Sequence, residues 1–415
     1  MRFEPKSVVV VDLNEYGLAE LVRDVRSTEG LYVRDEFRCY TLNFADPIFE
    51  RIFREEKGFD IVANFSAHKH VRSEKDKYSV QALIENNDIK AKKLMDLLTA
   101  YDPFLDFIKV YAILAVLLGH TFPFLDETGY NLWYGMQVPL FILVQVFHVM
   151  KKTNYKLNVR KMLQRILLPF LIIQMIPLSY VLYHTFNGNN LIFSYIFGGG
   201  YGPGAYFPWL YLQLAIILPI IKPLIEKGSK VRNLTIALIL CIALEILTSL
   251  SGCPDRAYRL LPIRYFFLIF LGWLWVKEGI VINTKSIILS LLSMGSIIYF
   301  EYFYTPTEPW FYNTSWRCHR WPCYFYVSHL LCGLLYYLYI RVKKMILIQR
   351  VVKLLARCSY EIFLIQMVLI PFMPPMNFIQ NGFLRLGLWM STVFMVSILG
   401  GYYFNTLYGK YIKTT

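Results

Sequence analysis

The fold is decided at residues 104–120, where the chain reads Phe104-Leu105-Asp106-Phe107-Ile108-Lys109-Val110-Tyr111-Ala112-Ile113-Leu114-Ala115-Val116-Leu117-Leu118-Gly119-His120. Apolar residues fill most positions of this stretch, which continues with similar character to residue 124. A helix needs about 20 such residues to cross the roughly 30 Å hydrocarbon core of a bilayer. The stretch therefore predicts a membrane-spanning helix that carries an aspartate, a lysine and a histidine.

Nine further apolar stretches follow, which makes ten in all. They lie at 133–150, 164–184, 206–226, 234–251, 260–276, 286–304, 323–341, 359–373 and 384–408. The chain of 415 residues is 56% hydrophobic and 17% charged, whereas soluble chains are about one quarter charged. We expect an all-α polytopic membrane protein with about ten transmembrane helices over residues 101–415. The same composition excludes a disordered chain and a disulfide-stapled small protein.

Charge is divided unevenly along the chain. Residues 1–100 carry a net charge of −2 and residues 101–415 a net charge of +16, so the basic excess belongs to the apolar part. If the N-terminus is cytoplasmic, the loops and tail on that side hold twenty Lys and Arg residues and the opposite side holds six. Cytoplasmic loops carry such an excess. We therefore expect both termini in the cytoplasm, the lipid bilayer as a partner, and no nucleic-acid partner.

The three ionisable side chains of the first stretch are expected on one helix face. Lys109 and His120 are eleven residues apart, about three turns and ~16 Å along the axis of an α-helix. Asp106 lies three residues before Lys109 and can pair with it. An ionisable residue at membrane depth is by default a functional hypothesis. The alternative is that Lys109 reaches the cytoplasmic interface and His120 caps the other end of the helix.

The spacing Lys109-x10-His120 resembles the Arg/Lys-x10-His element of membrane acyltransferase family 3, and four further stretches resemble this family in the same order. They are Val138-Pro139-Leu140-Phe141, Arg165-Ile166-Leu167-Leu168-Pro169-Phe170, Pro208-Trp209-Leu210-Tyr211-Leu212 and Ser359-Tyr360-Glu361-Ile362-Phe363-Leu364-Ile365-Gln366. The chain departs from the family pattern at Met162, where an arginine is common, and at Gln366, where a histidine is common. The resemblance covers residues 101–415.

This resemblance implies a membrane O-acyltransferase, most simply an O-acetyltransferase, in a bacterial inner membrane. Acetyl-CoA would be a co-substrate rather than a bound cofactor, and the acceptor would be a hydroxyl of an envelope polysaccharide or a lipid-linked sugar. Since Gln366 cannot accept a proton as histidine does, His120 is the expected base or acyl carrier. Lys109 would anchor a phosphate or stabilise developing charge, with Asp106 orienting it.

The basic segment at 160–165 is the expected binding site for acyl-CoA. Arg160, Lys161 and Arg165 would attract the phosphates of the donor. The alternative is that this charge only sets the topology. A non-enzymatic carrier or exporter of a glycan precursor is the alternative function for the whole chain.

Other polar residues of the apolar part allow more than one interpretation. Trp209, Glu245 and Arg264 are expected to line an acceptor cavity, or else Glu245 and Arg264 pair structurally. The run Gly198 to Gly204 predicts a flexible loop. Cys253 and Cys318 either form a disulfide or stay free, and no metal site is expected.

The first hundred residues predict a small cytoplasmic α/β fragment. Strands are expected at 7–12 and 59–65, and helices at 14–26 and 78–100. The stretch from Val62 to Asp76 resembles the bacterial polysaccharide-biosynthesis NAD-dependent epimerase/dehydratase family. No Gly-x-Gly-x-x-Gly phosphate loop precedes the strand expected at 7–12, and the chain has become apolar helix where the Tyr-x-x-x-Lys pair of such enzymes should lie. We expect a partial Rossmann fragment over 1–100 that does not bind NAD and has no catalytic activity.

Overall fold

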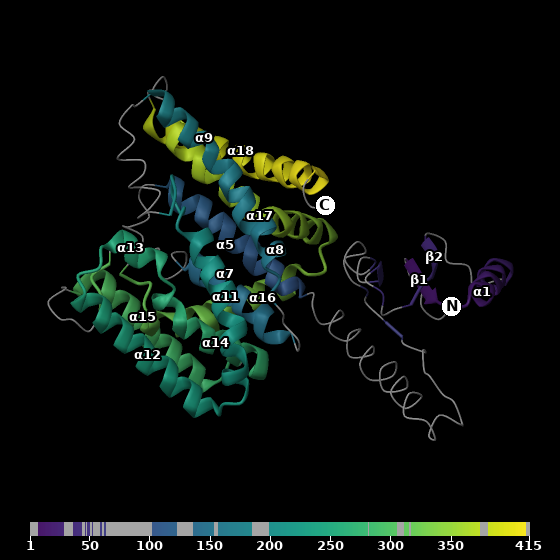
Figure 1. Ribbon diagram of the computed structural model, residues 1–415, viewed down its shortest axis with the longest axis horizontal. Helices are drawn as coiled ribbons and strands as arrows, with labels where there is room; N and C mark the ends of the chain where they lie inside the picture. Colours follow the sequence, from purple (N-terminus) through teal and green to yellow (C-terminus); the bar gives the residue numbers. More distant parts are fainter. Residues whose placement is uncertain are drawn as a thin grey trace. The chain divides into compact units, whose positions relative to one another are not determined.

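The computed structural model divides the chain into two compact units, Met1–Asp102 and Pro103–Thr415, shown in Figure 1. It describes residues 7–28, 36–43, 102–122, 136–152, 157–184, 199–280, 282–304, 311–314, 317–373 and 381–411, together with a few positions between 46 and 63. Each unit is treated by itself below.

The N-terminal unit contains a parallel β–α–β arrangement. Strand β1 (Ser7–Asp12) pairs in parallel with β2 (Glu36–Thr41), and helix α1 (Glu15–Ser27) connects them. The Asn14 side chain caps α1 by accepting a hydrogen bond from the backbone N–H of Gly17 at 3.1 Å. The strand predicted at 7–12 and the helix predicted at 14–26 are confirmed. The predicted helix at 78–100 and most of the predicted strand at 59–65 lie outside the described residues.

The second unit consists of helices joined by turns and loops, and none of its described residues lies in a β-strand. Its longer helices are α5 (Pro103–Thr121), α7 (Gln137–Lys151), α9 (Leu168–His184), α11 (Phe207–Glu226), α12 (Lys230–Leu250), α14 (Phe266–Glu278), α15 (Thr284–Ile298), α16 (Cys332–Val342), α17 (Ile346–Phe372) and α18 (Gly382–Tyr411). Short α-helical and 3₁₀ segments join them at α8 (Val159–Met162), α13 (Asp255–Leu260), η5 (Ile263–Tyr265) and η7 (Trp321–Cys323). Three π-helical segments, η4 (Leu163–Leu167), η6 (Tyr299–Phe303) and η8 (Tyr326–Leu331), are continuous with α9, α15 and α16.

The expected polytopic all-α membrane fold is confirmed. Eight helical segments of the described residues are long and apolar enough to cross a membrane. The other two predicted spans correspond to α7, with 15 residues, and α14, with 13 residues. At 1.5 Å per residue these helices are only about 20 Å long. The ninth predicted span is longer than expected, since α17 begins at Ile346 rather than near 359.

The two short helices are interior helices that pack on each other. Nine residues of α14 are buried, and no polar face interrupts them, as expected for a helix surrounded by protein. Gly272 of α14 faces Val146 of α7, and a Cβ at Gly272 would lie 2.5 Å from a Val146 methyl group. Small residues permit such close helix contacts within membranes.

Helix α5 lies at the centre of the helical unit. It packs against both α17 and α7, and Ile108, Ala112 and Leu117 are completely buried. In Figure 1, α9, α17 and α18 run along one side of α5 and α7, with α12 and α15 on the other. Only 22% of the apolar window of α12 and 11% of that of α18 are buried, so these helices present apolar side chains outward. The first apolar stretch of the sequence thus forms the core rather than the rim.

Candidate active site

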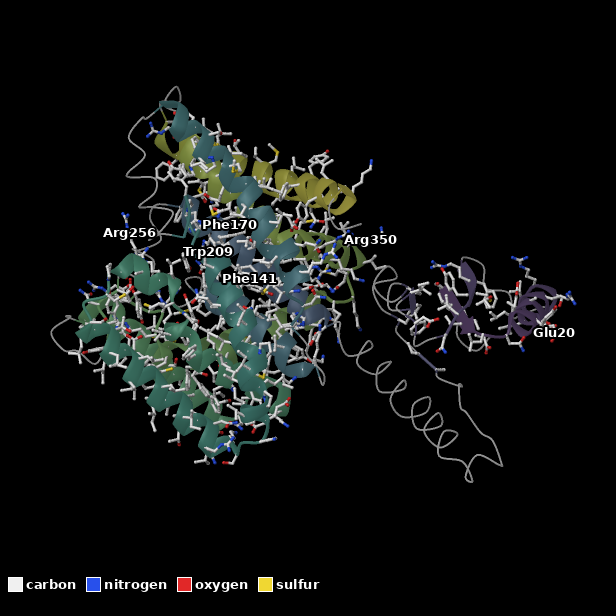
Figure 2. All side chains as sticks on the ribbon, viewed as in Figure 1. Glu20, Phe141, Phe170, Trp209, Arg256 and Arg350 are labelled. Carbon is white, nitrogen blue, oxygen red and sulfur yellow. The ribbon has the colours of Figure 1, made fainter. Side chains whose placement is uncertain are left out.

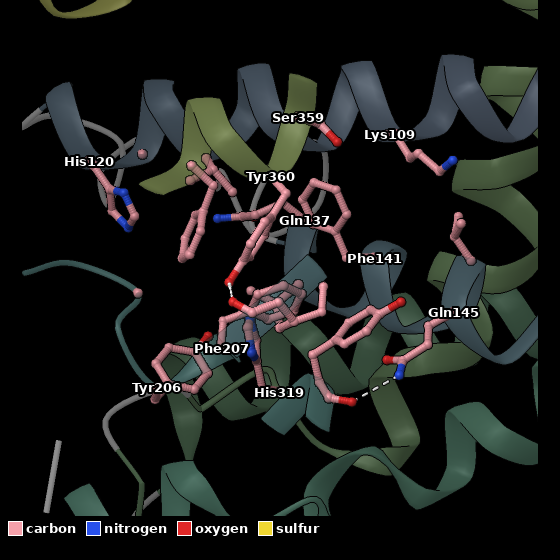
Figure 3. A pocket seen from close by; sticks show the side chains of 18 of the residues that line it. Lys109, His120, Gln137, Phe141, Gln145, Tyr206, Phe207, His319, Ser359 and Tyr360 are labelled. Carbon is pink, nitrogen blue, oxygen red and sulfur yellow. Dashed lines mark hydrogen bonds between the residues drawn. The ribbon is translucent and has the colours of Figure 1, made fainter. Parts of the chain in front are cut away.

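A cavity of about 400 Å³ lies beside α5 and is shown in Figure 3. Helices α5, α7, α11 and α17 supply most of its wall. The lining residues of these helices are Lys109, Val116, Gly119 and His120 of α5; Gln137, Val138, Phe141, Val144, Gln145 and His148 of α7; Phe207 and Tyr211 of α11; and Ala356, Ser359, Tyr360 and Phe363 of α17. Ile166, Gly204, Tyr206, Glu301, Arg317, Cys318 and His319 complete it. Most of these side chains are apolar or aromatic with a few polar groups among them, which is typical of a small-molecule site.

Lys109 and His120 both line this cavity. Eleven residues of α-helix bring them to nearly the same face of α5, about three turns apart. Figure 3 shows them at opposite ends of the part of α5 that flanks the cavity, with Tyr360 between them. We call these the Lys109 end and the His120 end of the cavity. The structure therefore brings together the two residues on which the sequence prediction depends.

Asp106 pairs with Lys109, although Asp106 itself is not among the described residues that line the cavity. The Nζ of Lys109 lies 3.1 Å from Asp106 Oδ1, one turn earlier on α5, as the spacing predicted. Both side chains are largely buried, and a charged group at this depth requires such a partner. The carboxylate fixes the position of the ammonium group without itself facing the cavity.

His120 is held by a residue that is 246 positions further along the chain. Its Nδ1 lies 2.9 Å from Oε1 of Gln366 on α17, and Gln366 is completely buried. An amide oxygen only accepts hydrogen bonds, so Nδ1 donates and Nε2 keeps its lone pair. The sequence marked Gln366 only as a departure from a family pattern. Its contact with His120 selects the tautomer that a base requires.

The glycine run passes close to His120 as part of a packed loop. Gly204 has φ = +85°, and a Cβ there would lie 2.7 Å from the Phe363 ring and 3.9 Å from Cε1 of His120. Gln174 of α9 makes two hydrogen bonds of 3.0 Å with the backbone of Tyr201. The described residues 199–204 are packed against α9 and α17, which the prediction of a flexible loop did not include. Positive φ and close packing, rather than mobility, explain these glycines.

The basic segment borders the cavity through Ile166. Tyr360 Oη donates to the carbonyl of Ile166 in η4 at 2.7 Å, and both residues line the cavity. Arg165 directly precedes Ile166 in η4, while Arg160 and Lys161 lie on α8, and all three side chains are exposed. The three basic residues are not among the described residues of the wall, but their segment forms one of its edges.

Polar side chains from distant segments lie in the wall beyond α5. Glu301 of η6 accepts a hydrogen bond from the Cys318 thiol, with 2.8 Å between Sγ and Oε2. Arg317 donates to the Glu301 carbonyl at 3.3 Å, and His319 Nδ1 lies 3.2 Å from Tyr265 Oη. Hydropathy indicates no function for these residues, because Glu301 lies at the end of a predicted span and Arg317, Cys318 and His319 lie between two predicted spans. Two π-helical segments, η4 and η6, contribute to the wall, and such segments are frequent at functional sites.

The cysteines are free thiols, so the Cys253–Cys318 disulfide is not formed. Burial, together with the hydrogen bond to Glu301, raises the pKa of the Cys318 thiol. A neutral thiol is a poor nucleophile. Within the described residues, no group of three His, Cys, Asp or Glu side chains is placed to hold a metal ion.

Trp209, Glu245 and Arg264, predicted to line an acceptor cavity, are not among the described residues of this wall. Glu245 and Arg264 both contact Tyr258, which favours the structural alternative for these two. Glu245 is turned inward, where it accepts hydrogen bonds from Tyr258 Oη at 2.5 Å and from the Tyr312 backbone at 2.9 Å. The Arg264 guanidinium lies over the Tyr258 ring at 4.6 Å. Hydropathy does not reveal these internal partners.

Trp209 supports the glycine loop instead of lining the cavity. Its indole N–H donates to the carbonyl of Gly199 at 2.5 Å, and its ring meets Phe170 edge to face at 6.0 Å. Figure 2 shows Trp209 and Phe170 close together on the helical unit. The contact fixes one end of the loop that passes His120.

Comparisons with known proteins agree with the helical unit. A family model described as an acyltransferase domain matches residues 102–407, a range that begins one residue before the second compact unit. No curated protein and no solved structure matches the chain. The resemblance of residues 1–100 to the epimerase/dehydratase family is not supported by any match and remains a prediction. The family match covers well over half of the chain, and the matched part forms a bundle of apolar helices with a cavity inside it. The chain therefore belongs to acyltransferase family 3, a family of membrane acyltransferases.

Proposed function

We propose that this protein transfers an acetyl group from acetyl-CoA to a hydroxyl of an envelope polysaccharide or a lipid-linked sugar. The observation that supports this proposal most strongly is the wall shared by Lys109 and His120, with His120 held by Gln366. One cavity thus offers a cation for an anionic donor and a lone pair for a hydroxyl proton. A bacterial inner membrane with both termini in the cytoplasm is part of the proposal and rests on the charge of the loops.

The donor would bind at the Lys109 end. Acetyl-CoA carries several phosphate charges, and the cations of the cavity and its border include Lys109 in the wall and Arg160, Lys161 and Arg165 on the segment that contributes Ile166. Cationic side chains attract and position phosphates. Asp106 restrains the Lys109 ammonium, so it is positioned before the donor arrives. The acyl group would then extend along α5 toward His120.

His120 would act as a general base at the other end. Nε2 takes the proton of the acceptor hydroxyl while its oxygen attacks the thioester carbonyl carbon. The tetrahedral intermediate collapses as the C–S bond breaks, and the proton passes from the imidazolium to the leaving CoA sulfur. The alternative, in which Nε2 carries the acetyl group between donor and acceptor, uses the same lone pair and the same contact with Gln366.

A direct test compares wild type with His120→Asn and His120→Ala in liposomes. The asparagine amide retains a donor for Gln366 but has no basic lone pair, which makes this variant the matched control for folding. With labelled acetyl-CoA and a crude envelope-glycan fraction, wild type should transfer label and both variants should not. Label transfer at the wild-type rate by His120→Asn would remove His120 from the chemistry. Absence of transfer by folded wild type would reject the proposed function itself.

A further inference from the structure

The His120 end of the cavity is built from segments that the chain keeps far apart. Gly204 approaches His120 directly, and Tyr206, two residues later, shares a side-chain hydrogen bond with Tyr265. Tyr265 in turn contacts His319. These contacts form a path from the loop beside His120 to the segment 317–319. Its polar part runs from Tyr206 through Tyr265 to His319, and Tyr206 and His319 both line the cavity.

Glu301 and Arg317 lie at the outer part of this path. Arg317 donates to the Glu301 carbonyl, and Cys318, the next residue, donates to the Glu301 carboxylate. Both Glu301 and Arg317 line the cavity, and their side chains are accessible rather than fully buried. The two charged side chains in the described wall beyond α5 are therefore one carboxylate and one guanidinium.

The two ends of the cavity differ in charge. On three helical segments, a lining residue has basic neighbours in the sequence. These neighbours are Lys151 and Lys152 shortly after His148, Arg165 directly before Ile166, and Arg357 directly after Ala356. Beyond α5, the wall itself holds the Glu301 carboxylate and the Arg317 guanidinium, while the neighbouring Arg320 guanidinium is buried against the rings of Phe300 and Tyr304. A carboxylate repels phosphates, so this part of the wall does not suit the anionic portion of the donor.

The groups at this end suit a ligand with several hydroxyl groups. A carboxylate only accepts hydrogen bonds, a guanidinium only donates, and a hydroxyl does both. The Glu301 carboxylate can accept about four hydrogen bonds. The Cys318 thiol donates one of them, so the carboxylate can still accept others. The rings of Tyr206 and Phe207 add apolar area beside these polar groups, a combination that matches the mixed polar and apolar faces of a sugar ring.

We infer that Glu301, Arg317 and His319 form the acceptor subsite, and that it takes an uncharged, hydroxyl-rich sugar. This inference rests on the proposed function and specifies its acceptor. It replaces Trp209, Glu245 and Arg264, which face internal partners. The acceptor hydroxyl would meet His120 from the side of Tyr206, opposite to the direction from which the donor arrives.

The test measures acetyl transfer from acetyl-CoA to methyl glucoside, methyl galactoside, methyl N-acetylglucosaminide and the anionic methyl glucuronide. Wild type in liposomes should acetylate at least one neutral glycoside in preference to the glucuronide. Glu301→Gln should raise the KM for that glycoside about tenfold, because a hydrogen bond to a charged group is lost. The KM for acetyl-CoA should stay within about twofold of wild type. Because the variant removes a negative charge, it should also narrow the preference against glucuronide, a change that a purely structural role would not produce.

Two further variants keep the test decisive. Glu245→Gln removes a buried carboxylate outside the wall and should leave the acceptor KM unchanged. Arg317→Gln, on an exposed side chain, serves if Glu301→Gln does not fold, and should also raise the acceptor KM several-fold. The inference is overturned if wild type prefers the glucuronide, if it binds acetyl-CoA but acetylates envelope glycan without accepting any neutral glycoside, or if the variants that fold leave the acceptor KM unchanged. If wild type acetylates neither envelope glycan nor any glycoside, the proposed function fails first.

Discussion

Two regions of the helical unit bury ionisable groups, and they use them differently. In the cavity wall, Lys109 and His120 each have one supporting partner and still face open space. In the polar cluster of Glu245, Tyr258, Arg264 and Tyr312, the charges are directed at neighbouring side chains and backbone. The comparison shows that depth in the membrane does not identify a site. What distinguishes a functional group is a partner on one side and a cavity on the other.

The largest effect is expected at His120. Replacing it with alanine should lower kcat by about 10²–10⁴-fold, the usual contribution of a positioned general base. Steady-state transfer of labelled acetyl groups by purified protein measures this change. The same substitution leaves the buried Oε1 of Gln366 without its donor and should lower the thermal midpoint. His120→Asn retains a donor and should keep the midpoint close to that of wild type while losing the same activity. If His120→Asn lost stability and activity to the same extent, His120 would have a structural role like the residues of the polar cluster.

Gln366 should show the next largest effect. Gln366→Leu removes the acceptor for Nδ1, and loss of such a supporting contact should lower kcat by about 10–100-fold. The KM for acetyl-CoA should not change. Gln366→Glu restores an acceptor of nearly the same shape and should recover most of the lost kcat. If the leucine and glutamate variants are equally impaired, packing at this position, and not the hydrogen bond, explains the loss.

Two lysines sharpen the comparison further. Lys109 faces the cavity, whereas Lys222 donates to the carbonyls of Val149 and Met150 at the end of α7, at 2.9 and 3.0 Å. Lys109→Ala should raise the KM for acetyl-CoA about tenfold, because a charged contact to phosphate is lost. Lys222→Ala should lower stability by about 1–3 kcal/mol through unsatisfied carbonyls and leave that KM unchanged. Transfer kinetics and thermal unfolding, measured on both variants, separate the two roles, and interchanged results would contradict the assignment.

The basic segment should contribute less than Lys109. Neutralising Arg160, Lys161 and Arg165 together should raise the KM for acetyl-CoA a few-fold and weaken its dependence on salt concentration, since exposed charges are screened. Kinetics at two salt concentrations test this expectation. If the segment only sets topology, the variant should instead show altered labelling of engineered loop cysteines and an unchanged KM.

The smallest effect on activity is expected in the polar cluster. Glu245→Gln leaves Tyr258 and the Tyr312 backbone with a weaker acceptor and should cost about 1–3 kcal/mol of stability. Acetyl transfer per folded molecule should remain within about twofold of wild type. A large fall in kcat without a fall in thermal midpoint would show that Glu245 takes part in the site and not only in the polar cluster.

The sequence predicted the local part of this arrangement and not the part made by packing. Lys109, His120 and Asp106 lie on one continuous helix, so their relation follows from its 3.6-residue period. Gln366 lies 246 residues from His120, and Glu301 and His319 reach the cavity only through contacts between distant segments. Glu245 and Arg264 were assigned to a cavity because their internal partners, Tyr258 and Tyr312, look like ordinary aromatic residues in a hydropathy pattern.

The central claim is that donor and base meet in the cavity beside α5. The most direct test is an experimental structure with a non-transferable acetyl-CoA analogue in which a methylene group replaces the thioester sulfur. We predict the acyl carbonyl within about 4 Å of His120 Nε2, the near-attack separation, and phosphates beside Lys109 and the basic segment. An analogue bound outside this cavity, or a His120 ring turned away from the acyl group, would contradict the claim.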